Sequence, residues 1–175
     1  MDLIAPESLN WYAIYTTPKS EKKIASHLVK FGIETFLPIV PRLRIWSDRK
    51  KTLEMPLFPS YLFVRIEYWK DRNHFYNLPG FVRFVFENSK VAVFPENDIE
   101  TVKIFVKEYP DTLEASKLEM SKPGTELVVK SGSFKGKKVV VIKKGNSANL
   151  LVRFPSLGAV ASVSIPIDDL GFEES

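Results

Sequence analysis

The chain has 175 residues, of which 45% are hydrophobic and 26% charged, which is typical of a globular protein with one or two small domains. It contains no cysteine and two histidines, which excludes disulfides and thiol nucleophiles and argues against a zinc site or a histidine-based triad. The net charge of +4 is too small to identify a polyanionic partner, and without an apolar run of ~18 residues or a secretory leader we expect a cytoplasmic protein with no membrane segment.

The first predicted elements are a strand over 11–16 and a helix that follows the Thr-Pro pair at 17–18. Ile24, Leu28 and Phe31 recur at i, i+4 and i+7, so they predict the apolar face of a helix that ends near residue 32. The polar side of this segment is basic and carries Lys19, Lys22, Lys23, His27 and Lys30. Such a face is most often only solvated, but the same pattern makes sequence-independent contacts to phosphates.

The following segments complete an alternation of strands and helices. An extended segment over 33–46 leads to an exposed hairpin tip at 47–51 and a strand within 56–66. A short helix over 69–78, a strand over 81–86 and a helix from Pro95 follow. The order β-α-β-β-α-β-α is the split βαβ, ferredoxin-like pattern, an antiparallel sheet with helices on one face.

The strand within 56–66 is unusually aromatic. Its apolar even-numbered residues are expected to face the helices, so that Tyr61, Phe63 and Arg65 face the other way. An uncovered aromatic patch there predicts a protein-binding or base-stacking surface. The alternative is that a loop or a neighbouring domain covers this face, and the pattern alone leaves both possibilities open.

The charge pattern divides the chain. Residues 95–119 carry seven acids against three lysines, and residues 120–144 carry seven lysines against one acid. The segment 108–122 is polar, lacks an apolar face and ends before a Pro-Gly pair, so it predicts a tether. Beyond it, short β-favouring runs separated by Gly, Ser and Asn turns predict a small all-β barrel. We therefore expect a domain at 8–107, a linker at 108–122 and a barrel at 123–172.

No catalytic constellation can be assembled from the residue pattern. His27 falls on the basic helix face and His74 in a polar helix start, while Asp168 and Asp169 are adjacent on a strand and would point to opposite faces. Nucleotide-binding glycine motifs and metalloprotease motifs are missing. The sequence therefore predicts a binding protein without catalytic activity, cofactor or metal.

Five segments in the correct order resemble the NusG family of transcription elongation factors over nearly the whole chain. WYAIYTTPKSEKKIASHL is similar to the family's first strand and helix, and PLFPSYLFVRI to its signature FPxYLFV block. LPGFVRFVF and VAVFPENDIETV are similar to the last strand and helix of its amino-terminal domain. PGTELVVKSGSFKGKKVVVI resembles the KOW motif, and RFPSLGAVASVSIPIDDL the remainder of its carboxy-terminal barrel. The resemblance implies an α+β protein, a ferredoxin-like domain followed by a small all-β KOW-type barrel.

The resemblance implies a non-enzymatic elongation and antitermination factor that binds bacterial RNA polymerase across its cleft and suppresses pausing and termination. The contact with the clamp helices of the largest subunit is implied for Phe58, Pro59, Tyr61, Phe63 and, more loosely, Phe84. Contact with the opposite pincer is implied for Arg72, Asn73 and His74. Contact with the non-template DNA strand of the transcription bubble is implied for Lys19, Lys22, Lys23, His27 and Lys30. This resemblance favours an exposed aromatic patch.

The KOW-like loop departs from the family pattern. It reads Gly132, Ser133, Phe134, Lys135 and Gly136, with serine where the family has proline and Val139 at a later glycine position. The partner of this loop in the family, a termination factor or a small-subunit ribosomal protein, is therefore left open here.

Two further questions concern the kind of factor. SLGAVASVSIP and YTTPKSEKK resemble specialised paralogues of the RfaH and UpxY types, so we expect a factor that serves long operons, such as those for polysaccharide synthesis, over a housekeeping factor. We also expect a monomer. The alternative from another class is an RNA-binding or ribosome-associated module. Residues 63–66, FVRI, imitate the end of an RNP1 strand, although the basic lead of that motif is missing.

Overall fold

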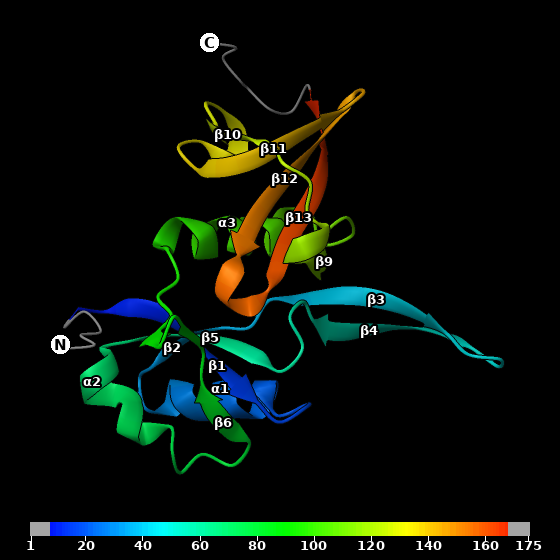
Figure 1. Cartoon of the computed structure of the whole chain (residues 1–175). Coiled ribbons are helices and arrows are strands. Elements are labelled where there is room, and N and C mark those ends of the chain that lie inside the picture. Colours follow the sequence, from blue (N-terminus) through cyan, green and yellow to red (C-terminus); the bar gives the residue numbers. More distant parts are fainter. Residues whose placement is uncertain (1–7, 168–175) are drawn as a thin grey trace. The chain divides into compact units, whose positions relative to one another are not determined.

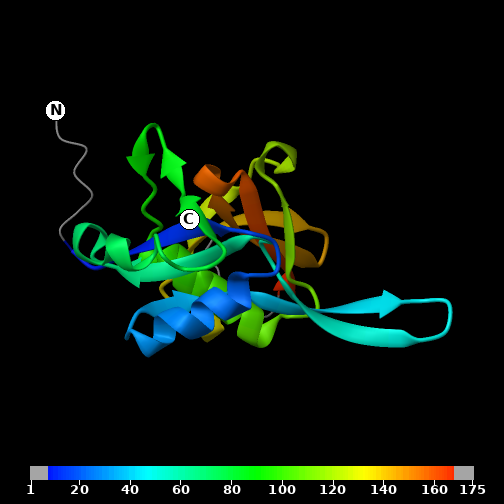
Figure 2. The ribbon, with the colours of Figure 1, turned by 90° about the horizontal axis from the view of Figure 1, so that it is seen from below.

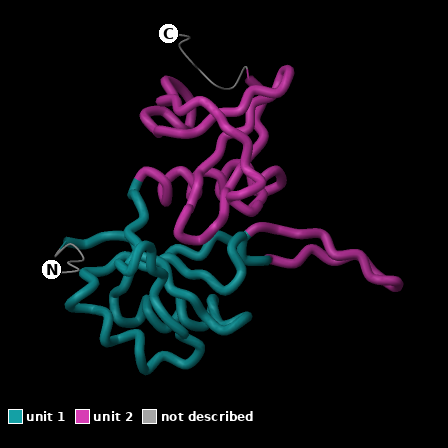
Figure 3. Tube along the Cα trace, viewed as in Figure 1, with its two compact units in different colours: residues 1–39, 55–96 teal, residues 40–54, 97–175 magenta. Residues whose placement is uncertain are grey.

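The computed structural model describes residues 8–167, which fold as two compact units (Figure 3). Unit 1 takes residues up to Ile39 together with Met55–Glu96, and unit 2 takes Val40–Glu54 together with Asn97 onward. The pair Asp168 and Asp169 and the last five residues of the predicted barrel lie outside the described residues. Within 8–167, none of the helices has the length and apolar character needed to cross a membrane.

Unit 1 is a four-stranded antiparallel sheet with short helices (Figure 1). Its elements are β1 (Asn10–Thr16), α1 (Glu21–Lys30), β2 (Glu34–Phe36), β5 (Tyr61–Ile66), α2 (Tyr68–Asp71), the 3-10 turn η1 (Arg72–His74), β6 (Phe81–Phe84), β7 (Phe86–Glu87) and β8 (Lys90–Val91). The strand order is β2-β5-β1-β6, and β7 pairs with β8 separately. This order confirms the predicted α+β class with split β-α-β connections.

The helix-side core of unit 1 follows the predicted alternation. Ile24 and Leu28 of α1 are buried against the even-numbered residues of β5, Leu62, Val64 and Ile66. Figures 1 and 2 show α1 running across one face of the sheet. Burial of these side chains removes apolar surface from water, which is the dominant stabilising term for such a layer.

Two helix predictions need correction. Phe31 was expected on the buried face of the first helix, but its side chain is exposed, because α1 ends at Lys30 and Phe31 is its C-cap. The predicted helix over 69–78 is shorter, since α2 ends at Asp71 and tight turns follow. The amide of Phe75 donates to the carbonyl of Arg72, three residues back, at 3.1 Å, and Leu78 repeats this with Phe75 at 3.0 Å.

Unit 2 contains a five-stranded antiparallel sheet and a long hairpin. Its elements are β3 (Ile39–Ile45), β4 (Lys50–Pro56), α3 (Glu96–Glu108), β9 (Glu114–Lys117), η2 (Leu118–Met120), β10 (Thr125–Val128), η3 (Gly132–Phe134), β11 (Lys138–Lys144), β12 (Ser147–Phe154), η4 (Pro155–Leu157) and β13 (Ala159–Pro166). The sheet order is β10-β11-β12-β13-β9. The four β-favouring runs after residue 123 therefore form four consecutive strands.

The segment expected as a tether behaves differently. Residues 114–117 form β9, which pairs antiparallel with β13 over Ala159–Ser162. All four side chains of β9 are exposed. Pairing of backbone groups along the edge of β13 therefore holds this strand in place, and such pairing leaves no hydrophobic pattern in the sequence.

Helix α3 packs with the strands of unit 2, whereas we expected it in the amino-terminal domain. The side-chain amide Nδ2 of Asn97 donates to the Lys138 backbone carbonyl at 2.9 Å, and its Oδ1 accepts from the Lys138 backbone amide at 3.1 Å. Beside it, burial raises the pKa of the Asp98 carboxyl, against the opposing effects of the Asn97 side chain and the Lys138 charge. Unit 2 therefore resumes at Asn97, whereas the predicted amino-terminal domain extended to residue 107.

Candidate functional site

The sheet face of unit 1 opposite to the helices carries an aromatic layer. Phe63 is its centre, and its ring lies 6.1 Å from Phe36, 6.1 Å from Phe58 and 5.2 Å from Phe94. The Phe58 and Phe94 rings meet Phe63 edge-on, a favoured geometry for aromatic pairs. The odd-numbered residues of β5 therefore face this side, as the alternation predicts.

The phenylalanines of this layer are buried within the whole chain. Phe63 is 0% exposed and Phe58 is also buried. Phe84 is buried too, but in the core on the helix side, where its ring contacts Tyr68 and Phe75. The structure therefore brings Phe58 and Phe63 together and separates both from Phe84.

The turn before β5 presents the surface part of the same block. Pro59 is exposed and Tyr61 is half-buried. Ser60 between them has a φ of 66°, a conformation that non-glycine residues rarely adopt. Its amide donates to Oε1 of the buried Glu21 at 2.7 Å, and its carbonyl accepts from the Thr16 amide at 2.8 Å. Glu21, from the first turn of α1, thus positions the turn, and sequence reasoning missed it.

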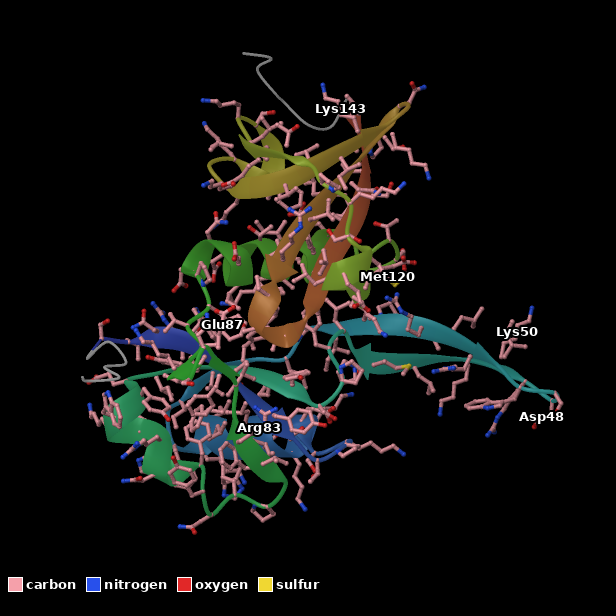
Figure 4. All side chains as sticks on the ribbon, in the orientation of Figure 1. Asp48, Lys50, Arg83, Glu87, Met120 and Lys143 are labelled. Atoms are coloured by element: carbon pink, nitrogen blue, oxygen red, sulfur yellow. The ribbon has the colours of Figure 1, made fainter. Side chains whose placement is uncertain are left out.

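Tyr61 belongs to a row of three side chains that crosses three strands, which we call the tyrosine row: Arg83 of β6, Tyr15 of β1 and Tyr61 of β5. Tyr15 is opposite Tyr61 in one strand pair and opposite Arg83 in the other. The two tyrosine rings are 5.3 Å apart. The guanidinium of Arg83, which is labelled in Figure 4, lies 5.5 Å from the Tyr15 ring. Because Arg83 is exposed and both tyrosines are half-buried, the row offers aromatic rings and one cation to a partner.

Sequence reasoning also missed Tyr15 and Arg83. Alternation along 11–16 would have placed Tyr15 on the same face as Trp11 and Ala13, but register between strands that are distant in the chain was needed to bring Tyr15 beside Arg83 and Tyr61.

The predicted basic face lies along α1. Lys19, Lys22, Lys23, His27 and Lys30 are all exposed. Lys23 and His27, one helical turn apart, line an open cavity of about 100 Å³ together with Ile24, Leu78 and Pro79. The far wall of this cavity is held to the start of α1 because the Thr17 amide donates to the Gly80 carbonyl at 2.8 Å.

The position of Gly80 does not tolerate a larger residue. Its φ is +93°, and a Cβ built there would lie 2.7 Å from the Ser20 Cβ and Oγ. Any side chain at this position would both strain the backbone and push the loop 78–80 away from α1.

An exposed ring connects two of the predicted sites. Phe31 lies 5.6 Å from the His27 ring and stacks on His74 at 6.0 Å. His74 and Asn73 are exposed, and Arg72 extends over the Trp69 ring at 4.4 Å. Residues expected to meet DNA and residues expected to meet a protein thus share one continuous surface of unit 1. Burial raises the pKa of the Tyr68 phenol beneath it.

The KOW-like loop is only partly accessible. Phe134 is buried, edge-on to Phe105 at 5.6 Å and stacked on Tyr109 at 5.7 Å. The loop residues Gly132, Lys135 and Gly136 are exposed. A partner of this loop would therefore meet a cation and backbone groups, while the phenylalanine stays covered by α3.

The chain is similar to proteins of known family. A family model described as "Transcription termination factor nusG" matches residues 9–103, more than half of the chain. The solved structure "Domain interaction in Thermotoga maritima NusG" shares 21% identity, covering 93% of this chain and 96% of that one, with a TM-score of 0.46.

Proposed function

The chain belongs to the NusG family of transcription elongation and termination factors, and on this premise we propose that it binds bacterial RNA polymerase through unit 1, in the cytoplasm. Bridging the polymerase cleft would favour its closed conformation over opened, paused states, because a ligand shifts a population toward the conformation that it binds better. The family is non-enzymatic, and the proposed mechanism needs no chemistry from the chain. The coverage of the FPSYLFV block by the family match supports this assignment.

The tyrosine row carries the proposal. It places two adjacent rings and a cation on the sheet face of unit 1, and tyrosine and arginine are among the residues enriched at the energetic centres of protein interfaces. Pro59 and Tyr61 make the direct contact with the clamp helices in this proposal. The buried Phe58 and Phe63 support them from below, and Phe84 supports the opposite side of the sheet.

Three further contacts complete the proposal. The exposed Asn73 and His74, with Arg72 behind them, meet the opposite pincer of the polymerase. The basic face of α1 lies along the non-template DNA strand. The exposed part of the KOW-like loop meets a termination factor or a small-subunit ribosomal protein. We also propose a monomer of the specialised class; a gene at the head of a long biosynthetic operon would support this role, and one among ribosomal-protein genes would contradict it.

Tyr61→Ala tests the polymerase contact. The full-length variant is expected to bind polymerase about 10-fold more weakly, since ~1.4 kcal/mol is a modest loss for an interface tyrosine, and to lose its effect on pausing. Tyr76→Ala is the matched control, because Tyr76 is an exposed tyrosine of unit 1 outside the row. Equal affinities of wild type and Tyr61→Ala, measured by titration against polymerase, would refute the contact.

Charge reversal tests the DNA contact separately. Lys23→Glu combined with Lys30→Glu is expected to reduce cross-linking to the non-template strand severalfold and to leave polymerase docking unchanged, because both lysines are exposed on α1. Lys90→Glu, an exposed lysine on β8, serves as the control. Loss of docking in the double variant would instead show that this helix face belongs to the protein interface.

A further inference from the structure

The hairpin of β3 and β4 is an unpartnered two-stranded sheet. Within residues 8–167 the two strands pair only with each other. Its turn is tight, because the Trp46 amide donates to the Arg49 carbonyl at 2.8 Å, and Asp48 marks its tip in Figure 4. Every residue from 43 to 52 is exposed. An isolated two-stranded hairpin is only marginally stable in water, so exposed apolar side chains at its end suggest that it contacts a partner.

One face of this hairpin end combines a ring with cations. Trp46 is 45% exposed, and the Arg49 guanidinium lies over its ring, 5.3 Å from the centroid. Lys50, labelled in Figure 4, and Lys51 follow Arg49 directly in the chain, and both are exposed. The arginine orients the indole while leaving nearly half of it open.

The charge around the Trp46 ring indicates the class of binding partner. Residues 42–54 contain five basic side chains and two acidic ones, Asp48 and Glu54. An acidic protein surface would complement the charge but would not need an open indole. Single-stranded nucleic acid complements both, because bases stack on aromatic rings in a sequence-tolerant way while lysine and arginine neutralise the phosphates. A base pair within a duplex has no free face to offer the ring.

We infer that the tip of the β3–β4 hairpin binds single-stranded nucleic acid, with one base stacked on Trp46 and adjacent phosphates neutralised by Arg49, Lys50 and Lys51. Arg49 also buttresses the far side of the indole. This site goes beyond the proposed function: it lies on a different element from the basic face of α1 and needs no polymerase. The bound strand is RNA or DNA, which share this chemistry.

Binding of short oligonucleotides to the full-length chain tests the site. Fluorescently labelled single-stranded RNA, single-stranded DNA of the same sequence and the corresponding DNA duplex are titrated at two salt concentrations. Trp46→Ala is expected to weaken single-strand binding about 10-fold, within the range measured for one base–aromatic stack. Lys50→Ala with Lys51→Ala is expected to lower the salt slope by about 1.4, because each neutralised phosphate contributes about 0.7 on single strands. The tighter of the two single strands identifies the natural ligand class.

Trp69→Ala is a closely matched control. Trp69 is also 45% exposed and also lies under an arginine, Arg72 at 4.4 Å, but in unit 1. It is expected to leave oligonucleotide affinity unchanged. The loss caused by Trp46→Ala should persist in the Lys23→Glu, Lys30→Glu background, since sites that share no partner usually contribute independently. The inference is overturned if Trp46→Ala binds like wild type, if Trp69→Ala loses as much, or if the duplex binds as tightly as the single strands.

Discussion

Replacing Phe63 with alanine is expected to lower the free energy of unfolding of unit 1 by about 3–5 kcal/mol, the usual cost of removing a buried phenylalanine ring. Phe63 is fully buried, and three rings, Phe36, Phe58 and Phe94, contact it. The truncated side chain would leave a cavity that these rings cannot close without losing their own contacts. Urea unfolding of the full-length chain, followed by tryptophan fluorescence, measures the effect.

Phe86→Ala provides the comparison for this variant. It removes the same ring from a position that is 48% exposed, so it is expected to cost less than about 1 kcal/mol. Similar midpoints for the two variants would mean that the aromatic layer is not the packed core that we describe. If the expected difference is found, weak polymerase binding by Phe63→Ala is explained by unfolding of unit 1. The contact with polymerase is then tested by Tyr61→Ala alone.

Removing the Glu21 carboxylate is expected to cost about 1–3 kcal/mol and to weaken polymerase binding as well. Glu21→Ala would leave the Ser60 amide without its 2.7 Å acceptor in a partly buried turn, and an unsatisfied donor of this kind carries this cost. Because Ser60 holds a φ of 66°, loss of this hydrogen bond should let the turn relax and move Tyr61. Denaturant unfolding and polymerase titration measure the two effects.

Glu21→Gln separates the hydrogen bond from the residue's size. The glutamine carbonyl can still accept from Ser60, so most of the stability should return, although an amide is a weaker acceptor than a carboxylate. Glu87→Ala removes an exposed glutamate of unit 1 and should change neither measurement. The positioning role of Glu21 would be refuted if its alanine variant kept full stability and full polymerase affinity.

Local patterns predicted much of unit 1 and most strands of unit 2 correctly. Ile24 and Leu28 are buried as their helical spacing predicts, and the even-numbered residues of β5 face the helix-side core. These predictions succeed because helical and strand periodicity are set by backbone geometry within one element. Helical spacing wrongly predicted burial of Phe31, because α1 ends one residue before it.

Predictions that depended on partners distant in the chain were less successful. Alternation placed Phe63 on the face opposite to the helices, but its ring contacts with Phe36 and Phe94 come from other segments of the chain, which periodicity within β5 cannot predict. Likewise, β9 pairs with β13 through backbone groups that every residue possesses, so its polar sequence is typical of a tether.

The amino-acid sequence by itself determined most of the order of strands and helices, the side on which each side chain of β5 lies and the family to which the chain belongs, since these follow from local periodicity and short motifs. Only the tertiary structure decided that Phe63 is core while Tyr61 reaches the surface, that Glu21 holds the turn between them, and that Tyr15 and Arg83 complete the tyrosine row. The physical reason is that burial and register are properties of contacts between segments, and each contact depends on residues that are far apart in the chain.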